Sequence, residues 1–215
     1  MNIQKPKPLR EQVYEKLKEM IIEGEISPDE RIVESDYATL FNISRTPIRE
    51  AIRMLELEGL VEIGDKGGAR IKKITPKDIK EIFKIRVALE GIIIDEIITS
   101  KNPDLSALEK LLDETYNLIV EDKNPKAVVK SFAEFNSLLY GLSEFKKVVE
   151  MINNINLYLR RFRRISLDKS ERRKKAYFQH VELFKAIKDK KLERALEVNK
   201  KHLDDSMNFL LNSAK

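Results

Sequence analysis

The chain has 215 residues, of which 42% are hydrophobic and 36% are charged, so it can form one or two domains with a real core. It has no cysteine, which excludes disulfides and thiolate chemistry and is typical of a reducing cytoplasm. The formal net charge of +5 suits a polyanionic partner without proving one. Residues 1–10 lack the apolar core of a signal peptide, and the longest apolar run ends at Asp95, so we expect a cytoplasmic protein without a membrane span.

The first 74 residues show the element order of a winged helix-turn-helix. Apolar residues recur at helical spacing in three segments, and the second and third are separated by a tight break. Two short alternating segments around a glycine-containing loop then predict a β-hairpin wing. The predicted elements are helices over residues 9–23, 34–41 and 44–58 and strands over residues 60–63 and 69–74.

Only helical patterns follow. Thr75 is a candidate cap for a helix with Pro76 at its first position, so we place the domain boundary between residues 1–74 and 75–215. Four of the five breaks between the later helices contain Asn, Pro, Gly or Asp, and the fifth is Lys190-Lys191. The predicted helices span residues 76–99, 104–121, 125–141, 144–165, 170–189 and 191–212. We therefore expect a mainly α protein whose second domain is an all-α antiparallel bundle.

The third helix combines an apolar stripe with a basic face. The stripe consists of Ile48, Ala51, Ile52 and Leu55. Ser44 is placed to cap the helix, and Pro47 lies near its start, where a missing N–H does little harm. Arg45, Thr46 and Arg49 fall off the stripe and can contact guanine edges or phosphates. A solvated amphipathic helix is the alternative, but the helix-turn-helix spacing favours DNA contact.

The predicted wing ends in a tip that suits nucleic acid. Lys66, Gly67 and Gly68 offer a cation and bare backbone, which can approach a minor groove or a phosphate closely. An ordinary hairpin turn is the alternative.

Polar residues on apolar helix faces mark a candidate ligand site in the second domain. Arg86, Asn136, His180 and His202 each lie in line with apolar neighbours at helical spacing. Two imidazoles from neighbouring helices can hold a divalent metal, and an inward arginine can bind a carboxylate. The alternatives are satisfied core histidines and a helix-surface pair between Arg86 and Glu90.

The densest charge in the chain lies around residues 160–175. Its members are Arg160, Arg161, Arg163, Arg164, Arg172, Arg173, Lys174 and Lys175. We interpret this cluster as a solvated helix end or a contact with a partner subunit, and DNA contact is the alternative. There is no glycine-rich phosphate loop, no cysteine and no serine in a nucleophile elbow, so we do not expect an enzyme.

Two sets of motifs, together covering nearly the whole chain, carry a family resemblance. The run from Ser44 to Val61, with scattered matches from Gln12 onward, resembles the winged helix-turn-helix of the GntR family of bacterial transcription regulators. The second domain resembles the all-helical FCD effector domain of the FadR-like subgroup. Its matching segments are residues 85–90, Phe135-Asn136, Gln179-His180 and Lys201-His202-Leu203.

This resemblance implies a homodimer that binds a short palindromic DNA operator. Arg45, Thr46 and Arg49 would enter the major groove, while Gly67 and Gly68 would reach the minor groove. A small effector, often a carboxylate, would bind in the helical domain and change the affinity for the operator. The expected function is thus a ligand-responsive transcription regulator, with repression as the default.

The chain departs from the family pattern in its metal-ligand set and at one DNA contact. Many FCD domains bind a metal through an Asp, a His four residues later and two further His, and these positions read Phe132, Asn136, His180 and His202. Because an amide oxygen is a poor ligand for zinc or nickel, a polar cavity that holds an organic anion directly is the competing expectation. Ser35 occupies the position of a basic DNA contact seen in part of the family.

Two other functions remain open at this point. One is a metal-binding or enzymatic helical bundle with a vestigial winged helix. The other is a constitutive DNA-architectural protein that has no effector.

Overall fold

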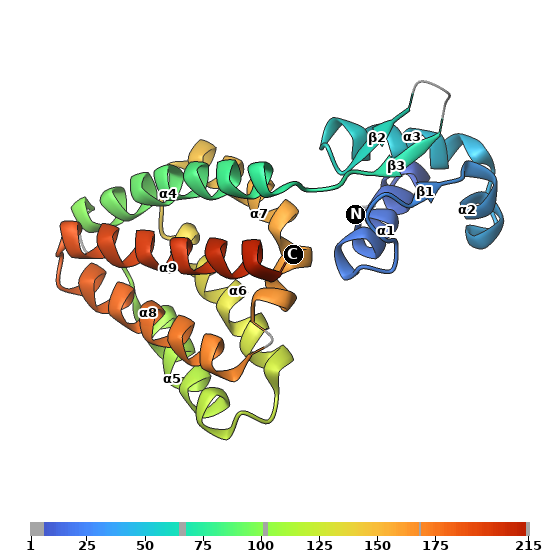
Figure 1. Cartoon of the computed structure of the whole chain (residues 1–215). Helices are drawn as coiled ribbons and strands as arrows, with labels where there is room; N and C mark the ends of the chain where they lie inside the picture. The colour runs from blue at the N-terminus through green and yellow to red at the C-terminus, as the bar shows by residue number, and fades with distance from the viewer. Residues whose placement is uncertain (1–6, 65–67, 101–102, 168, 214–215) are drawn as a thin grey trace, which may run out of the picture. The chain divides into compact units, whose positions relative to one another are not determined.

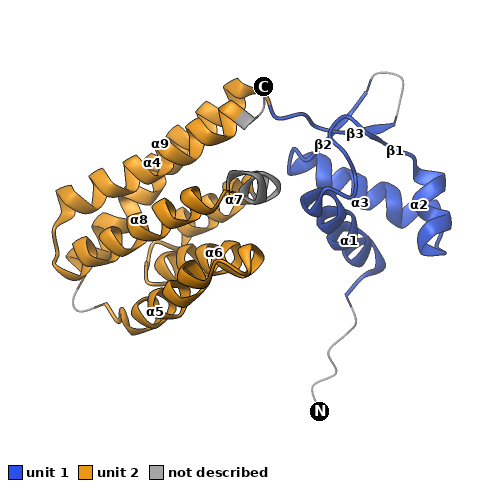
Figure 2. Ribbon diagram, turned by 60° about the horizontal axis from the view of Figure 1, so that its bottom comes forward, with its two compact units in different colours: residues 1–74 blue, residues 75–215 orange. Residues whose placement is uncertain are grey.

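The computed structural model describes residues 7–64, 68–100, 103–167 and 169–213. The chain forms two compact units, Met1–Ile74 and Thr75–Lys215 (Figure 2). The first contains helices and a small sheet, and the described part of the second is helical throughout (Figure 1). The predicted mainly α fold with a small β-hairpin wing and a helical bundle is therefore confirmed. Across the described ranges, every helix is too short or too polar to cross a lipid bilayer.

In the first unit, three helices surround a small core. Its elements are α1 (Leu9–Glu23), β1 (Arg31–Ile32), α2 (Glu34–Phe41), α3 (Arg45–Leu57), β2 (Val61–Ile63) and β3 (Ala69–Ile71). The helix α3 packs on α1 and α2 through Ile48, Ala51 and Leu55, which are fully buried. The apolar stripe predicted for this helix is confirmed, since Ile52 is buried as well. Burial of this stripe fixes which face of α3 points to solvent.

The sheet has one more strand than the predicted hairpin. The strand β1 pairs antiparallel with β3, on the opposite edge from β2, so the strand order is β1-β3-β2. Arg31 lies opposite Arg70 in this register. A two-residue strand is too short to show alternation, so the sequence pattern could not reveal it.

In the second unit, the helices form one bundle around a common core. They are α4 (Pro76–Thr99), α5 (Ser106–Glu121), α6 (Pro125–Gly141), α7 (Lys146–Ser166), α8 (Ser170–Lys188) and α9 (Leu192–Ser213). Long helices α4 and α9 pack side by side, and α8 packs against both α9 and α5 (Figure 1). The core includes Ile93, Ile97 and Phe135, which are almost completely buried. The helix ends lie within one or two residues of the predicted ends, which is the usual scatter of such boundaries.

The two predicted helix caps turn out differently. At α4, the Thr75 hydroxyl accepts the Asp78 N–H at 3.2 Å, and the Asp78 carboxylate accepts the Thr75 N–H at 2.8 Å. This capping box satisfies two free donors and fixes the start of α4 directly after the first unit. Ser44 occupies the capping position of α3 but makes no side-chain cap. One donor that a capping serine can use is absent there, because the third helical residue is Pro47.

We expect Thr75→Ala to lower the free energy of unfolding of the helical unit by about 1 kcal/mol, because the first turn of α4 loses its cap. Urea unfolding followed by far-ultraviolet circular dichroism measures this change. Thr99→Ala is the matched control at the other end of α4, where the hydroxyl donates to the Asp95 and Glu96 carbonyl oxygens of its own helix. Equal destabilisation by the two variants would contradict a capping role for Thr75.

Candidate nucleic-acid interface and ligand cavity

The first turns of α3 present cations and an uncapped helix start to solvent. Arg45, Thr46 and Arg49 are exposed, Pro47 is half-buried, and the first turn contains no acidic residue. Because Ser44 makes no side-chain cap, the free N–H groups at this helix start are open to an outside acceptor. The positive end of the helix dipole and the arginines act in the same direction here. The arrangement can therefore bind phosphate groups.

The two arginines of this face are not equivalent. The Arg49 guanidinium binds both oxygens of Glu34 on α2, with Nε 3.0 Å from Oε1 and Nη2 2.8 Å from Oε2. This hydrogen-bonded pair lowers the pKa of the Glu34 carboxyl. Within the described residues, Arg45 forms no ion pair. Arg45 can thus meet a phosphate or base directly, whereas Arg49 must first exchange Glu34 for its new partner.

The wing tip is described only at its end. Lys66 and Gly67 lie outside the described residues. Gly68 has φ = +92°, and a Cβ atom there would lie 2.8 Å from Nε of Arg31. The backbone conformation thus favours glycine whether or not DNA contacts it, whereas the exposed Arg31 side chain could move aside for a Cβ atom. The contact also puts Arg31, an exposed cation that the sequence analysis did not single out, beside the wing.

A cavity of about 60 Å³ lies inside the helical unit. Its apolar wall is formed by Phe83, Phe132, Leu159, Leu167, Ala176 and Leu210. Its polar wall contains the four predicted residues together with two that were not predicted: Arg86, Asn136, His180, His202, Arg172 and Ser206. The volume can take about four to six water molecules, or a small organic molecule in their place.

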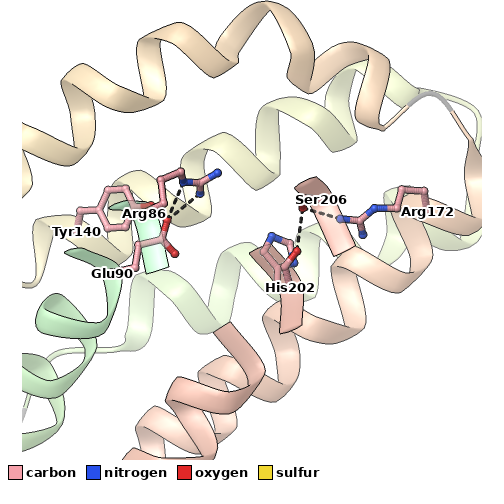
Figure 3. Close-up of polar contacts among 6 residues, drawn as sticks. All are labelled: Arg86, Glu90, Tyr140, Arg172, His202 and Ser206. Atoms are coloured by element: carbon pink, nitrogen blue, oxygen red, sulfur yellow. Dashed lines mark hydrogen bonds and ion pairs between the residues drawn. The ribbon is translucent and has the colours of Figure 1, made fainter. Parts of the chain in front are cut away.

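Arg86 belongs to a buried polar cluster that joins α4 to α6. Its Nη2 and Nε atoms lie 2.7 and 3.1 Å from Oε1 of Glu90, and the Tyr140 hydroxyl donates to the same oxygen at 2.8 Å (Figure 3). Both charged side chains are almost fully buried, so this is not a helix-surface pair. Burial, and to a smaller extent the negative charge of Glu90, raise the pKa of the Tyr140 hydroxyl above its ordinary value. The charge of Arg86 is already balanced inside the protein.

The two histidines lie next to each other. His180 is buried and stacks on Phe135, with ring centres 4.4 Å apart, and the Phe132 ring packs against it in a T-shaped arrangement with ring centres 4.8 Å apart. The ring centre of His202 lies 4.7 Å from that of His180. The Nδ1 atom of His202 is 3.0 Å from Oε1 of Gln179, which fixes the orientation of the half-buried ring.

These residues do not fit the metal site that the resemblance implied. Within the described ranges, no group of three or more His, Cys, Asp or Glu side chains is placed to hold a metal ion. Phe132 contributes only an aromatic edge where a carboxylate would be needed. A zinc or nickel ion on His180 and His202 would have Asn136 as its further ligand, and an amide is a poor one. The zinc or nickel site predicted on these three residues therefore lacks a sufficient ligand set.

Part of the basic cluster is buried, which corrects its interpretation as a solvated helix end. The side chains at residues 160, 161, 163 and 164 lie outside the described ones. Arg172 and Arg173 of α8 are only 8% and 4% exposed. Arg173 binds the Asp122 carboxylate at 2.6 Å and the Leu167 carbonyl oxygen at 2.9 Å. Arg172 lines the cavity and donates to the Ser206 hydroxyl at 2.7 Å (Figure 3).

Sequence reasoning missed Arg172 because it lies in a run of four basic residues. A signal was nevertheless present. Arg172, Ala176 and His180 recur at intervals of four, so they share one face of α8, and His180 had already been assigned to the inside.

Comparisons with known proteins agree with both units. The family model described as "Bacterial regulatory proteins, gntR family" matches residues 9–71, and the FCD domain model matches residues 81–205. The HTH-type transcriptional regulator YdhC of Bacillus subtilis is 33% identical over 194 residues, which cover 90% of this chain and 87% of that protein. The gluconate operon transcriptional repressor of Bacillus licheniformis is 26% identical over 204 residues, covering 88% and 79%.

Solved structures support the same fold. Escherichia coli McbR/YncC superposes with a TM-score of 0.77 over 98% of this chain and 100% of its own, at 19% sequence identity. The matched families are transcription regulators and not enzymes. With an FCD domain model that covers more than half of its residues and a relative of 33% identity along nearly its full length, the chain belongs to the GntR family of bacterial transcription regulators with a C-terminal FCD effector domain.

Proposed function

We propose that this protein is a homodimeric repressor that binds a palindromic operator and is released from it by a small carboxylate. The observation that carries the proposal is the cavity in the effector domain, which four predicted polar residues line together. A GntR regulator that keeps such a polar cavity has a place for an effector, unlike a constitutive DNA-architectural protein. The Bacillus licheniformis relative is named as a repressor, which supports repression as the mode of action.

In this proposal the first turns of α3 enter the major groove. Arg45 and Thr46 contact bases or phosphates, and the open helix start after Ser44 takes a phosphate. Arg49 binds DNA after it leaves Glu34. At the wing, Lys66, Gly67 and Gly68 approach the minor groove. A second copy of the chain supplies the second half-site, because a two-fold protein matches a two-fold operator.

The cavity favours a small acid. Its volume suits a molecule of roughly four to six heavy atoms, which is the size range of acetate, glycolate and lactate. Asn136 and His202 can hydrogen-bond a hydroxyl group, and Phe132 and Leu210 can cover a carbon chain. A hydroxy acid thus matches the mixture of polar and apolar walls. Gluconate, the sugar acid for which the Bacillus licheniformis relative is named, is a larger test compound of the same class.

In this proposal, repression and release follow from the thermodynamic coupling between effector binding and operator binding. An effector that binds one arrangement of the helical domains better than the other shifts the protein toward that arrangement. Release from DNA requires that the favoured arrangement holds the two recognition helices at a spacing that fits the operator worse. The coupling in such systems is typically about 1–3 kcal/mol.

We expect Arg45→Ala and Arg49→Ala each to weaken operator binding by about 1–3 kcal/mol, because each removes a contact to a base or phosphate. The operator is first selected from a library of random duplexes, and affinities are then measured by fluorescence anisotropy at fixed salt. Arg194→Ala is the matched control, since it removes one exposed arginine from the other unit. Unchanged affinity in both α3 variants would count against the assignment of α3 as the reading helix.

For the effector, we expect glycolate, lactate or gluconate to raise the unfolding temperature of the protein relative to sodium chloride of equal ionic strength. At a ligand concentration of 100 times Kd, the stabilisation is about 2.7 kcal/mol. His202→Ala and Asn136→Ala should lose this response, whereas Lys200→Ala, an exposed neighbour on α9, should keep it. The same acid should weaken operator binding. An acid that stabilises the protein without changing operator affinity would show that the cavity is not a sensor.

A further inference from the structure

Two arginines line the cavity, and their electrostatic situations are opposite. Arg86 has a carboxylate partner, Glu90, at 2.7 Å, and its charge is balanced within the protein. Arg172 is just as deeply placed, with 8% of its surface exposed, but it has no carboxylate partner among the described residues. Within the described residues, the only hydrogen bond of its side chain is the one that its Nη2 atom donates to the neutral hydroxyl of Ser206.

The remaining N–H groups of Arg172 have no acceptor. Its Nε and Nη1 atoms are buried and make no hydrogen bond within the described part of the chain. Burial lowers the pKa of its guanidinium, and the charge of Asp205 acts in the opposite direction. A buried cation that is neither paired nor fully hydrogen-bonded is unfavourable, so folded proteins keep such groups rarely.

The nearest source of negative charge is committed to other groups. The Oδ2 atom of Asp205 accepts from Lys175 at 2.8 Å and from Gln179 at 2.7 Å. Gln179 in turn contacts His202 through its Oε1 atom. Asp205 thus orients His202 through Gln179, and it compensates the charge of Arg172 only in part, because it makes no hydrogen bond or ion pair with it within the described residues.

We propose that Arg172, held in place by Ser206, is the group that binds the anionic end of the effector, and that Arg86 is not. This inference rests on the proposed function, because it takes the cavity as the effector site. A carboxylate binds a guanidinium through its N–H groups, and the Nε and Nη1 atoms of Arg172, which lie on different edges of the group, each have an N–H for such a bond. The Ser206 hydroxyl also donates to the His202 carbonyl oxygen at 2.9 Å, so its own orientation is fixed. Ser206 is therefore a positioning residue.

With the carboxylate on Arg172, the rest of the acid lies among the other residues that line the cavity. Asn136 and His202 can bind a hydroxyl group, while Phe132 covers the carbon chain. Arg86 keeps Glu90 and contributes shape and rigidity, not the ion pair. This assigns the charge recognition to α8 and α9, whereas sequence reasoning had assigned it to α4.

The test compares substitutions at the two arginines, using the full chain. Arg172→Met removes the charge but keeps the length of the side chain, and Arg86→Met does the same at the other site. Melting temperatures are measured without ligand and with sodium glycolate, sodium lactate, sodium gluconate or sodium chloride, and affinities by titration calorimetry. Arg194→Met is the control for loss of an exposed arginine, and it should match the wild type in every measurement.

We expect Arg172→Met to melt at the same temperature as the wild type or higher, because it removes an unpaired buried charge. Its affinity for the acid should fall at least tenfold. Arg86→Met should melt at a lower temperature, because it leaves the Glu90 carboxylate buried without its cation. Arg172→Lys should retain part of the affinity, since a point charge replaces the planar fork. Ser206→Ala should bind several-fold more weakly with the guanidinium still present.

Two results would overturn the inference while the proposed function stands. One is wild-type affinity for the acid in both Arg172→Met and Ser206→Ala. The other is a melting temperature of ligand-free Arg172→Met that falls as far as that of Arg86→Met, which would make Arg172 a structural link between α8 and α9. If the wild-type protein binds its operator but responds to none of the three acids, the proposal of a carboxylate effector is wrong. The assignment of Arg172 as the group that binds it is then wrong as well.

Discussion

The helical unit depends on how it pairs the charges that it buries. Arg86 and Glu90, with Tyr140, join α4 to α6, and Arg173 binds Asp122 at the end of α5. Loss of Glu90 or Asp122 would leave a buried arginine without its carboxylate, so these pairs hold their helices in defined positions. Arg172 differs from both arginines, because no described carboxylate neutralises it. A buried charge needs a partner of opposite charge. The paired arginines have such a partner within the protein, whereas Arg172 can obtain one from a bound anion.

The DNA-binding unit could be predicted closely because its signals are local. The stripe of apolar residues in α3 follows helical spacing, and burial of Ile48 and Leu55 then leaves Arg45 and Arg49 facing outward. What could not be predicted were contacts between elements. The ion pair of Arg49 with Glu34 joins residues fifteen positions apart, and it depends on the angle between α2 and α3. The strand β1 is likewise defined by its partner β3 and not by its own two residues.

For the cavity, too, contacts between helices could not be predicted from the sequence. Its polar members could be predicted because Arg86, His180 and His202 stand out among apolar neighbours at helical spacing. Their roles could not, since a role depends on which partner each side chain meets. Glu90 was visible as a neighbour of Arg86, but the hydroxyl of Tyr140 comes from another helix. Arg172 was hidden in a basic run, where composition suggests solvent, although its spacing from His180 placed it on the inner face.

The position of the unpaired charge also suggests how an effector would act under the proposed function. An anion on Arg172 adds a charged partner between α8 and α9, and both of these helices pack against α4. Thr75, which caps α4, directly follows the boundary of the first unit, and the capping box keeps the first turn of α4 formed. A ligand shifts a conformational equilibrium only by its differential affinity for the two arrangements. A buried charge–charge contact depends steeply on distance, because the surroundings screen it little. A small change in the packing of α8 and α9 on α4 would therefore alter effector affinity, and by reciprocity the effector would alter that packing.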